Sequence, residues 1–166
     1  MSTSHFQEAR LTTAVHRGVW GSGWTVAALA APGLVLAAPT GGQVVAGSAA
    51  IAQAGTKTTI TQSTAKGAIN WQSFSIGTNE YVQFVQPGTT SVTLNRVVGN
   101  DPSQLLGQMS ANGQIFLVNP SGVYFGANAR IDVAGLVATT FDIADDDFMA
   151  GRYQFARVEE IGRAHV

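Results

Sequence analysis

Short runs of apolar and β-branched residues, separated by turn-forming residues, recur along the chain from about residue 56 onward. β-Branched and aromatic residues are enriched in strands, whereas Gly, Pro, Asn and Asp form turns. No helical stretch interrupts the series, although residues 104–109 fit a helix or a strand equally well. The pattern predicts strands at 56–62, 80–86, 91–98, 114–118, 123–125, 130–133 and 136–143, with turns at 87–88, 99–102, 112–113, 119–122 and 126–129.

The strand predicted at 91–98 has a mixed row of side chains. Because side chains alternate along a strand, Val92, Leu94, Arg96 and Val98 fall on one side. We expect Arg96 to mark the end of this strand that faces water.

The spacing of the strands restricts how they can pair. Turns recur about every six to nine residues, whereas a crossover between neighbouring parallel strands normally takes a dozen residues or more. Two architectures satisfy this restriction. Neighbouring strands can form antiparallel hairpins packed as a β-sandwich, or each strand can pair with the coil above it in a β-helix, with Asn and Gly at the corners. The pattern alone leaves both open.

The first 37 residues have the order of a secretory signal peptide. A few basic residues, opposed only by Glu8, precede an uncharged run from Val26 to Ala38 that ends in small residues. A membrane helix is the alternative, but the run is shorter than the roughly 20 residues that span a bilayer. We therefore predict a signal peptide over residues 1–37, cleaved after Ala37 or Ala38, and exclude it from the fold.

Composition adds to the picture by exclusion. Only 11% of residues are charged and the formal net charge is −1, so the chain offers no basic surface for nucleic acid. The 19 glycines and the many uncharged polar residues favour β structure over helix. Cysteine is absent, so the apolar core and the backbone ladders must hold the fold without disulfides.

The polar chemistry of the mature chain argues against an enzyme. Residues 38–158 contain no His or Cys, which excludes Ser–His triads, His-ligated metals and thiol nucleophiles there, and we expect no cofactor. A carboxylate pair such as Asp132 with Asp142 keeps a polysaccharide-active β-helix enzyme open as an alternative. A carbohydrate-binding β-sandwich is another. The acidic run 145–147 suits calcium poorly, and we expect it to form a solvated loop.

Five segments occur in an order that resembles a known family. Together they resemble the haemagglutination-activity domain at the front of two-partner-secretion exoproteins, such as filamentous haemagglutinin and high-molecular-weight adhesins, over about residues 43–143. The family's Asn-Pro-Asn-Gly motif has Ser121 at its third position here, and the Asn-Pro-Asn-Leu motif of some members is not visible. The segments are 70–77, 82–86, 94–97, 103–107 and 112–123.

The resemblance implies an all-β, right-handed parallel β-helix with some antiparallel hairpins over residues 38–158. It implies a non-enzymatic domain that nucleates folding and targets a large adhesin-type exoprotein of a Gram-negative bacterium for secretion. The implied route runs through the periplasm and a partner outer-membrane β-barrel transporter with periplasmic peptide-binding domains, to the cell surface. Contacts with host-cell receptors or glycans would belong to later regions of the exoprotein.

The resemblance also singles out the corner Asn119-Pro120-Ser121-Gly122. This motif is either a signal read by the transporter or a tight turn, and we favour the turn. Pro120 presets φ, Gly122 supplies conformational freedom, and the Ser121 hydroxyl can cap the turn in place of the missing Asn.

A second set of motif residues is mostly aromatic. Asn70, Trp71 and Phe74 could form a recognition patch, but we favour Trp71 and Phe74 closing one end of the core. Phe84 and Phe116 are expected in the core as well.

The last residues of the chain have an unusual sequence. Glu-Ile-Gly-Arg-Ala-His-Val at 160–166 matches the translation of a short-read sequencing adapter. We therefore interpret residues 159–166 as an artefact and the domain as truncated; a genuine polar tail is the alternative.

Overall fold

The computed structural model describes residues 37–157. All but the last residue of the predicted signal peptide and all of the predicted artefactual tail lie outside this range. Besides its strands, the described part contains one short helix, α2 (Asp145–Met149). The strands are β1 (Gln43–Ala46), β2 (Ala49–Ala54), β3 (Lys57–Gln62), β4 (Lys66–Trp71), β5 (Tyr81–Val85), β6 (Val92–Val97), β7 (Ser103–Leu105), β8 (Gln108–Ala111), β9 (Gln114–Val118), β10 (Val123–Phe125), β11 (Arg130–Asp132) and β12 (Gly135–Thr139).

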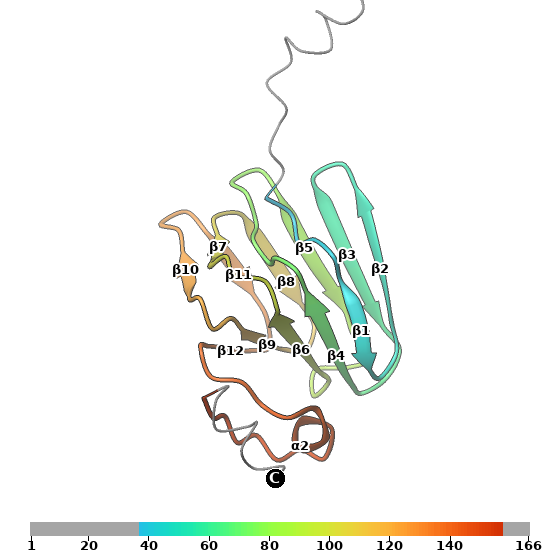
Figure 1. The fold of residues 1–166 in the computed structure, drawn as a ribbon. Helices are drawn as coiled ribbons and strands as arrows, with labels where there is room; N and C mark the ends of the chain where they lie inside the picture. Colours follow the sequence, from blue (N-terminus) through green and yellow to red (C-terminus); the bar gives the residue numbers. More distant parts are fainter. Residues whose placement is uncertain (1–36, 158–166) are drawn as a thin grey trace, which may run out of the picture. The chain divides into compact units, whose positions relative to one another are not determined.

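The strands stack as the coils of a β-solenoid (Figure 1). The first sheet has the order β1-β4-β6-β9-β12, the second β11-β8-β5-β3-β2, and the third contains β7 and β10. From β3 onward the pairings are parallel: Lys57 pairs with Tyr81, Tyr81 with Gln108, and Gln108 with Arg130, so successive coils take 24, 27 and 22 residues. The predicted all-β parallel β-helix is confirmed, and the β-sandwich alternative is wrong.

Antiparallel pairing is confined to the amino-terminal end of the solenoid. β1 pairs antiparallel with β4, and β2 pairs antiparallel with β3. The turn between β2 and β3 contains Gly55 with φ of 58°, in the left-handed region that glycine adopts without strain. β1 and β2 thus add an antiparallel layer, which we call the hairpin layer, to the first coil. This confirms the antiparallel part of the fold prediction.

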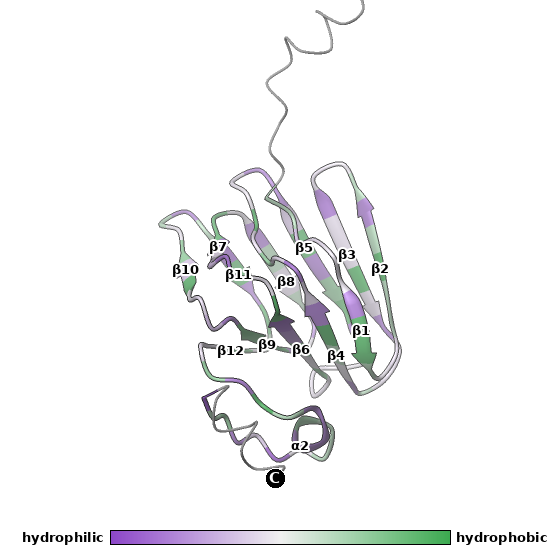
Figure 2. Cartoon of the chain, viewed as in Figure 1, coloured by the Kyte–Doolittle hydropathy of each residue, from purple (hydrophilic) through white to green (hydrophobic). Residues whose placement is uncertain are grey.

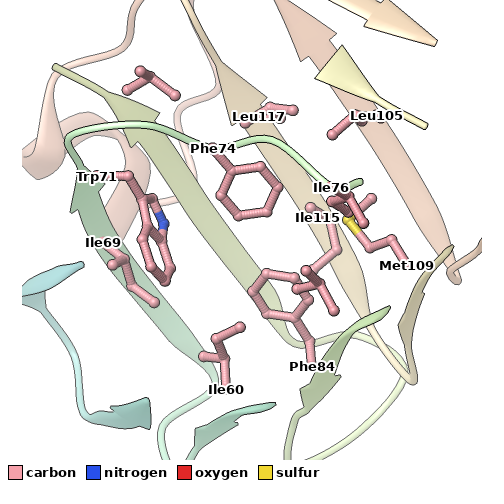
Figure 3. Close-up of a cluster of buried hydrophobic side chains, with 12 residues drawn as sticks. Ile60, Ile69, Trp71, Phe74, Ile76, Phe84, Leu105, Met109, Ile115 and Leu117 are labelled. Atoms are coloured by element: carbon pink, nitrogen blue, oxygen red, sulfur yellow. The ribbon is translucent and has the colours of Figure 1, made fainter. Parts of the chain in front are cut away.

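The interior of the coils is filled by stacked apolar side chains (Figure 3). Register explains the stacking, because Val82 lies beside Met109, and Met109 beside Ile131. Burying one such side chain contributes about 1.5–3 kcal/mol. The buried interior set is Ile60, Ile69, Trp71, Phe74, Ile76, Val82, Phe84, Val97, Leu105, Met109, Ile115 and Leu117.

Polar side chains also point into the interior, at the corner between the second and first sheets. The amide of Gln86 donates to Thr93 Oγ1 at 2.9 Å and to the carbonyl of Gln114 at 3.2 Å, and its oxygen accepts from the Gly113 N–H at 2.8 Å. Thr93 in turn donates to Gln62 Oε1 at 2.5 Å. Every buried side-chain nitrogen or oxygen in the described residues has a hydrogen-bond partner, so this polar stack costs little in desolvation.

Residues 140–157, which we call the strap, cover the outer face of the first sheet. Figure 1 shows this segment, with α2, outside the stacked strands. Phe148 and Ile143 of the strap pack on a second apolar cluster that includes Leu94 and Phe116. The central strands β4, β6 and β9 of the first sheet are therefore largely buried on both faces, whereas the second sheet has hydrophilic residues along β3, β5 and β8 (Figure 2).

Arg96 does not face water, as we had expected, because the strap covers it. The row Val92, Leu94 and Arg96 does share one side of β6, but this side faces the strap rather than water. Only 14% of the Arg96 side chain is exposed. The arginine is buried because it binds the strap, as described below.

Gly107 provides a test of how tightly the coils stack. A Cβ at this position would collide with the backbone carbonyl oxygens of Gly77 and Glu80 on the preceding coil, because it would lie far closer to them than van der Waals contact allows. We expect Gly107→Ala to lower the free energy of unfolding by about 1–3 kcal/mol, because backbone must shift to accommodate the methyl group. Urea denaturation followed by far-ultraviolet circular dichroism measures this loss.

Gly88 is the matched control for that substitution. A Cβ there would meet no atom within 4 Å, and its φ is not positive. Gly88→Ala is expected to change the free energy of unfolding by no more than about 0.5 kcal/mol. Equal losses in the two variants would show that the close approach of coils at Gly107 carries no special cost.

Candidate functional site: the Asn119 corner and the strap contact

The corner after β9 is a hydrogen-bonded turn. The Gly122 N–H donates to the Asn119 carbonyl at 2.9 Å, and the Ser121 N–H donates to Asn119 Oδ1 at 2.9 Å. Gly122 has φ of 111°, and Pro120 occupies the second position, where its fixed φ suits the turn. The local sequence therefore explains the corner, with Asn119 and Gly122 as its two specialised positions.

Asn119 also joins three successive coils. Its Nδ2 donates to the Asp101 carbonyl at 3.0 Å and to Ser103 Oγ at 2.9 Å, both on the preceding coil. Its backbone N–H donates to the Thr139 carbonyl on the following coil at 2.9 Å. The residue is completely buried, so a partner that meets the folded domain cannot contact its side chain.

Ser121 holds the corner through its backbone N–H and not, as we expected, through its hydroxyl. The bond that holds the turn uses its backbone N–H, which any residue except proline could supply. Pro120 and Ser121 are both exposed. The replacement of the family's third-position Asn by Ser therefore leaves the corner intact for a backbone reason, not through the hydroxyl.

Two other motif segments meet on the outer face of the first sheet. Asn70 and Arg96 are register partners on β4 and β6, and Arg96 Nη1 donates to Asn70 Oδ1 at 3.2 Å. The guanidinium also binds the strap: Nε donates to Asp142 Oδ1 at 2.7 Å, and Nη1 to Asp145 Oδ1 at 2.8 Å. A fourth bond runs from Nη2 to the Ile143 carbonyl at 2.5 Å. Sequence reasoning missed this contact.

The charge of Arg96 is secured by these partners. Burial alone would lower the pKa of the guanidinium, but hydrogen bonds and charge attraction from Asp142, and then from Asp145, outweigh it and raise the pKa above its ordinary value. Arg96 therefore stays charged at every pH at which the domain would be studied.

The acidic run 145–147 is not the solvated loop that we expected. It forms the first turn of α2, where negative charge is favoured by the exposed N–H groups. Asp145 pairs with Arg96, and Asp147 with Arg152 at 2.6 Å. Within residues 37–157 no group of three His, Cys, Asp or Glu side chains is placed to hold a metal ion.

The aromatic motif residues divide between two locations. Trp71 and Phe74 are 1% exposed and pack edge to face with ring centroids 5.5 Å apart, and Trp71 Nε1 donates to Asn95 Oδ1 at 3.0 Å. Phe84 joins them inside the coils. Phe116 is also buried but lies on the outer face, 5.0 Å from the ring of Tyr153. An exposed patch of Trp71 and Phe74 is incompatible with their burial in the folded domain.

The carboxylates considered for an enzyme are not gathered in one place. Asp132 ends β11 in the second sheet and is exposed. Asp142 belongs to the strap over the first sheet and is bound to Arg96. Asp132 thus lies on the second sheet, whereas Asp142 lies on the strap over the first sheet and is already paired with Arg96.

The comparisons with known proteins agree with the resemblance found in the sequence. The family described as TPS secretion domain matches residues 36–166. Two heme/hemopexin-binding proteins of Haemophilus influenzae are 48% and 45% identical over 105 and 101 residues, which is 63% and 61% of this chain. The chain matches only 12% and 11% of the length of these relatives. No helix among the described residues is long and apolar enough to cross a membrane.

A solved structure gives the same result for the fold. The HMW1 secretion domain from Haemophilus influenzae superposes with a TM-score of 0.70 and 39% sequence identity, over 74% of this chain and 32% of that one. The family match covers well over half of the chain. The chain therefore belongs to the family of TPS, or two-partner secretion, secretion domains, which target large exoproteins for export across the outer membrane.

Proposed function

We propose that this domain is recognised by its transporter in the unfolded state and that it nucleates folding of the exoprotein outside the cell. The burial of Asn119 carries the proposal. Its side chain bonds inside the folded solenoid, so this part of the motif is open to a transporter only before the coils have formed, whether the transporter reads the amide itself or the extended segment around it. The partner is an outer-membrane β-barrel with periplasmic peptide-binding domains.

Extended segments suit such a partner. Unfolded stretches that later become strands have free N–H and C=O groups and can add an edge strand to a periplasmic domain. Outside, each coil pairs with the preceding one, so folding can propagate along the solenoid. Folding on the far side disfavours return and helps to drive export without ATP.

The proposed route includes passage through the periplasm of a Gram-negative bacterium and delivery to the cell surface. The role is non-enzymatic, in keeping with the separate locations of Asp132 and Asp142. The relatives named heme/hemopexin-binding proteins suggest a ligand for a full-length exoprotein. We assign such binding, and any contact with host receptors or glycans, to regions of the exoprotein other than residues 38–158.

A disulfide that locks two coils together tests export in the unfolded state. Thr61 on β3 and Val85 on β5 are exposed register partners in a parallel pair, and such neighbours lie within the Cα separation that a disulfide needs. We expect Thr61→Cys/Val85→Cys to abolish secretion from transporter-expressing cells, because the oxidising periplasm closes the bond. Immunoblotting of medium and periplasm measures the effect.

The single-cysteine variants are the controls for this experiment. Thr61→Cys and Val85→Cys should each be secreted at the wild-type level, and a reductant in the medium should restore secretion of the double variant. Normal secretion of the cross-linked double variant would show that a folded domain passes the transporter, and the proposal would be wrong.

A further inference from the structure

We infer that docking of the strap is a separate, last step in the folding of this domain, and that Arg96 is the residue that holds the strap closed. The inference concerns the folded chain alone and goes beyond the proposed export role. It rests on three features of the strap: what it covers, how it is attached, and where its partners lie in the sequence.

The strap covers a cluster that is distinct from the interior of the coils. The interior cluster and the outer cluster share no residue. Every residue of the interior cluster, and every apolar residue packed against it, lies at or before Val133 in the sequence, so none of them belongs to the strap. The coils can therefore complete their interior without the strap, but the outer side chains Leu94 and Phe116 remain exposed until it arrives.

The strap is attached by side chains rather than by a strand ladder. Its paired backbone groups, Asp142 N–H with the Ala156 carbonyl and Ala156 N–H with the Asp142 carbonyl, bond within the strap at 2.8 Å each. Phe148 and Ile143 are its fully buried anchors in the outer cluster. A segment held in this way opens at a lower free energy than strands paired on both edges.

Two basic residues of the first sheet hold the two ends of α2. Arg96 binds the start of the strap through Asp142 and Asp145. Lys66 Nζ donates to the Met149 carbonyl at 3.1 Å, at the carboxyl end of the helix where positive charge is favoured. The same ammonium lies 5.5 Å from the centroid of the Tyr153 ring.

These contacts join distant parts of the chain. Asp142 and Asp145 follow Arg96 by 46 and 49 residues, and Phe148 follows Lys66 by 82. Contacts with such large separations form after the local coil-to-coil contacts, because closing a long loop loses chain entropy before the contacts at its ends stabilise the fold. Strap docking is thus the step that removes the apolar side chains on the outer face of the first sheet from water.

Hydrogen exchange with mass spectrometry tests the inference on the 166-residue chain. In Arg96→Ala we expect amides of the strap peptide to exchange roughly ten- to a hundredfold faster, since charged hydrogen bonds to Asp142 and Asp145 are lost. Peptides that contain β4 and β9 should keep their wild-type exchange rates. Equal acceleration of strap and coil peptides would show one cooperative unit and overturn the inference, as would an unchanged strap.

Arg152→Ala is the matched control. It removes an arginine–aspartate pair of the same chemistry, but one that lies within the strap, with the Arg152 side chain 60% exposed. Such exposed pairs contribute little, so exchange should remain at the wild-type rate in every peptide. If the strap amides exchange as fast in this variant as in Arg96→Ala, Arg96 is not the residue that holds the strap closed.

Phe148→Ala provides a second approach if Arg96→Ala does not fold. It removes a completely buried anchor from the strap side of the contact and leaves every coil residue in place. The strap peptide should again exchange faster while the β4 and β9 peptides stay protected. Loss of protection in those coil peptides would mean that the coils depend on the strap, and the inference would be wrong.

Discussion

Trp71→Ala should lower the free energy of unfolding by about 3–5 kcal/mol, as expected for truncation of a buried aromatic residue to alanine. Trp71 is the largest buried side chain of the interior cluster and packs edge to face on Phe74. It also contacts the amino-terminal hairpin layer, because a Cβ at Gly42 would collide with its ring. The truncation therefore leaves a cavity between the first coil and the strands that cover it.

The measurement is urea denaturation of the purified chain, followed by far-ultraviolet circular dichroism. Trp71→Phe measures the contribution of the indole N–H separately from that of the apolar ring. It keeps most of the apolar volume but leaves Asn95 Oδ1 without the 3.0 Å bond from Nε1. We expect this variant to lose about 1–3 kcal/mol. A loss below about 1 kcal/mol in Trp71→Ala would show that the first coil contributes little to the cooperative fold.

Sequence patterns predicted the strands whose own residues and flanking turns favour β structure. β3, β5, β6 and β9 are rich in β-branched or aromatic residues and are bounded by Gly, Pro or Asn, so their positions follow from local preference. The predicted short strand at 123–125 matches β10 for the same reason. Pairing was not local: antiparallel and parallel stacking both fitted the pattern, and the family resemblance selected between them.

The strands that were missed lack this local signature. β1 and β2 read QVVA and AAIAQA, and alanine is depleted in strands. β4 begins Lys-Gly-Ala, which a local reading takes for a loop. All three become strands because neighbours on other coils supply their ladder bonds and burial, so their structure depends on residues far away in the sequence.

The polar parts of the site were hidden for a related reason. A glutamine such as Gln86 resembles a surface residue until the Gly113 N–H and Thr93 hydroxyl that satisfy it are known. Arg96 was expected in water because its partners Asp142 and Asp145 lie on the strap. The separation of 46 and 49 residues leaves no periodic signal in the sequence.

Asn119→Ala should reduce secretion of the chain strongly, because we expect it to break the corner that Asn119 holds together. The substitution leaves the Asp101 carbonyl, Ser103 Oγ and the Ser121 N–H without their partner. Ser103 is completely buried, and a buried group left unsatisfied costs about 1–3 kcal/mol. We expect a matching fall in the free energy of unfolding in urea, and a fall in secretion measured by immunoblotting of the medium.

Gly107→Ala distinguishes a folding role of Asn119 from a signal that the transporter reads. It strains the contact between coils at Gly77 and Glu80 without touching the corner. If the two variants lose similar stability and similar secretion, Asn119 acts through folding, which is the result we expect. If Asn119→Ala is secreted far less than Gly107→Ala at equal stability, the transporter reads the amide in the unfolded chain. Ser121→Ala keeps the N–H that the turn uses, so either role of Asn119 leaves its secretion near the wild-type level.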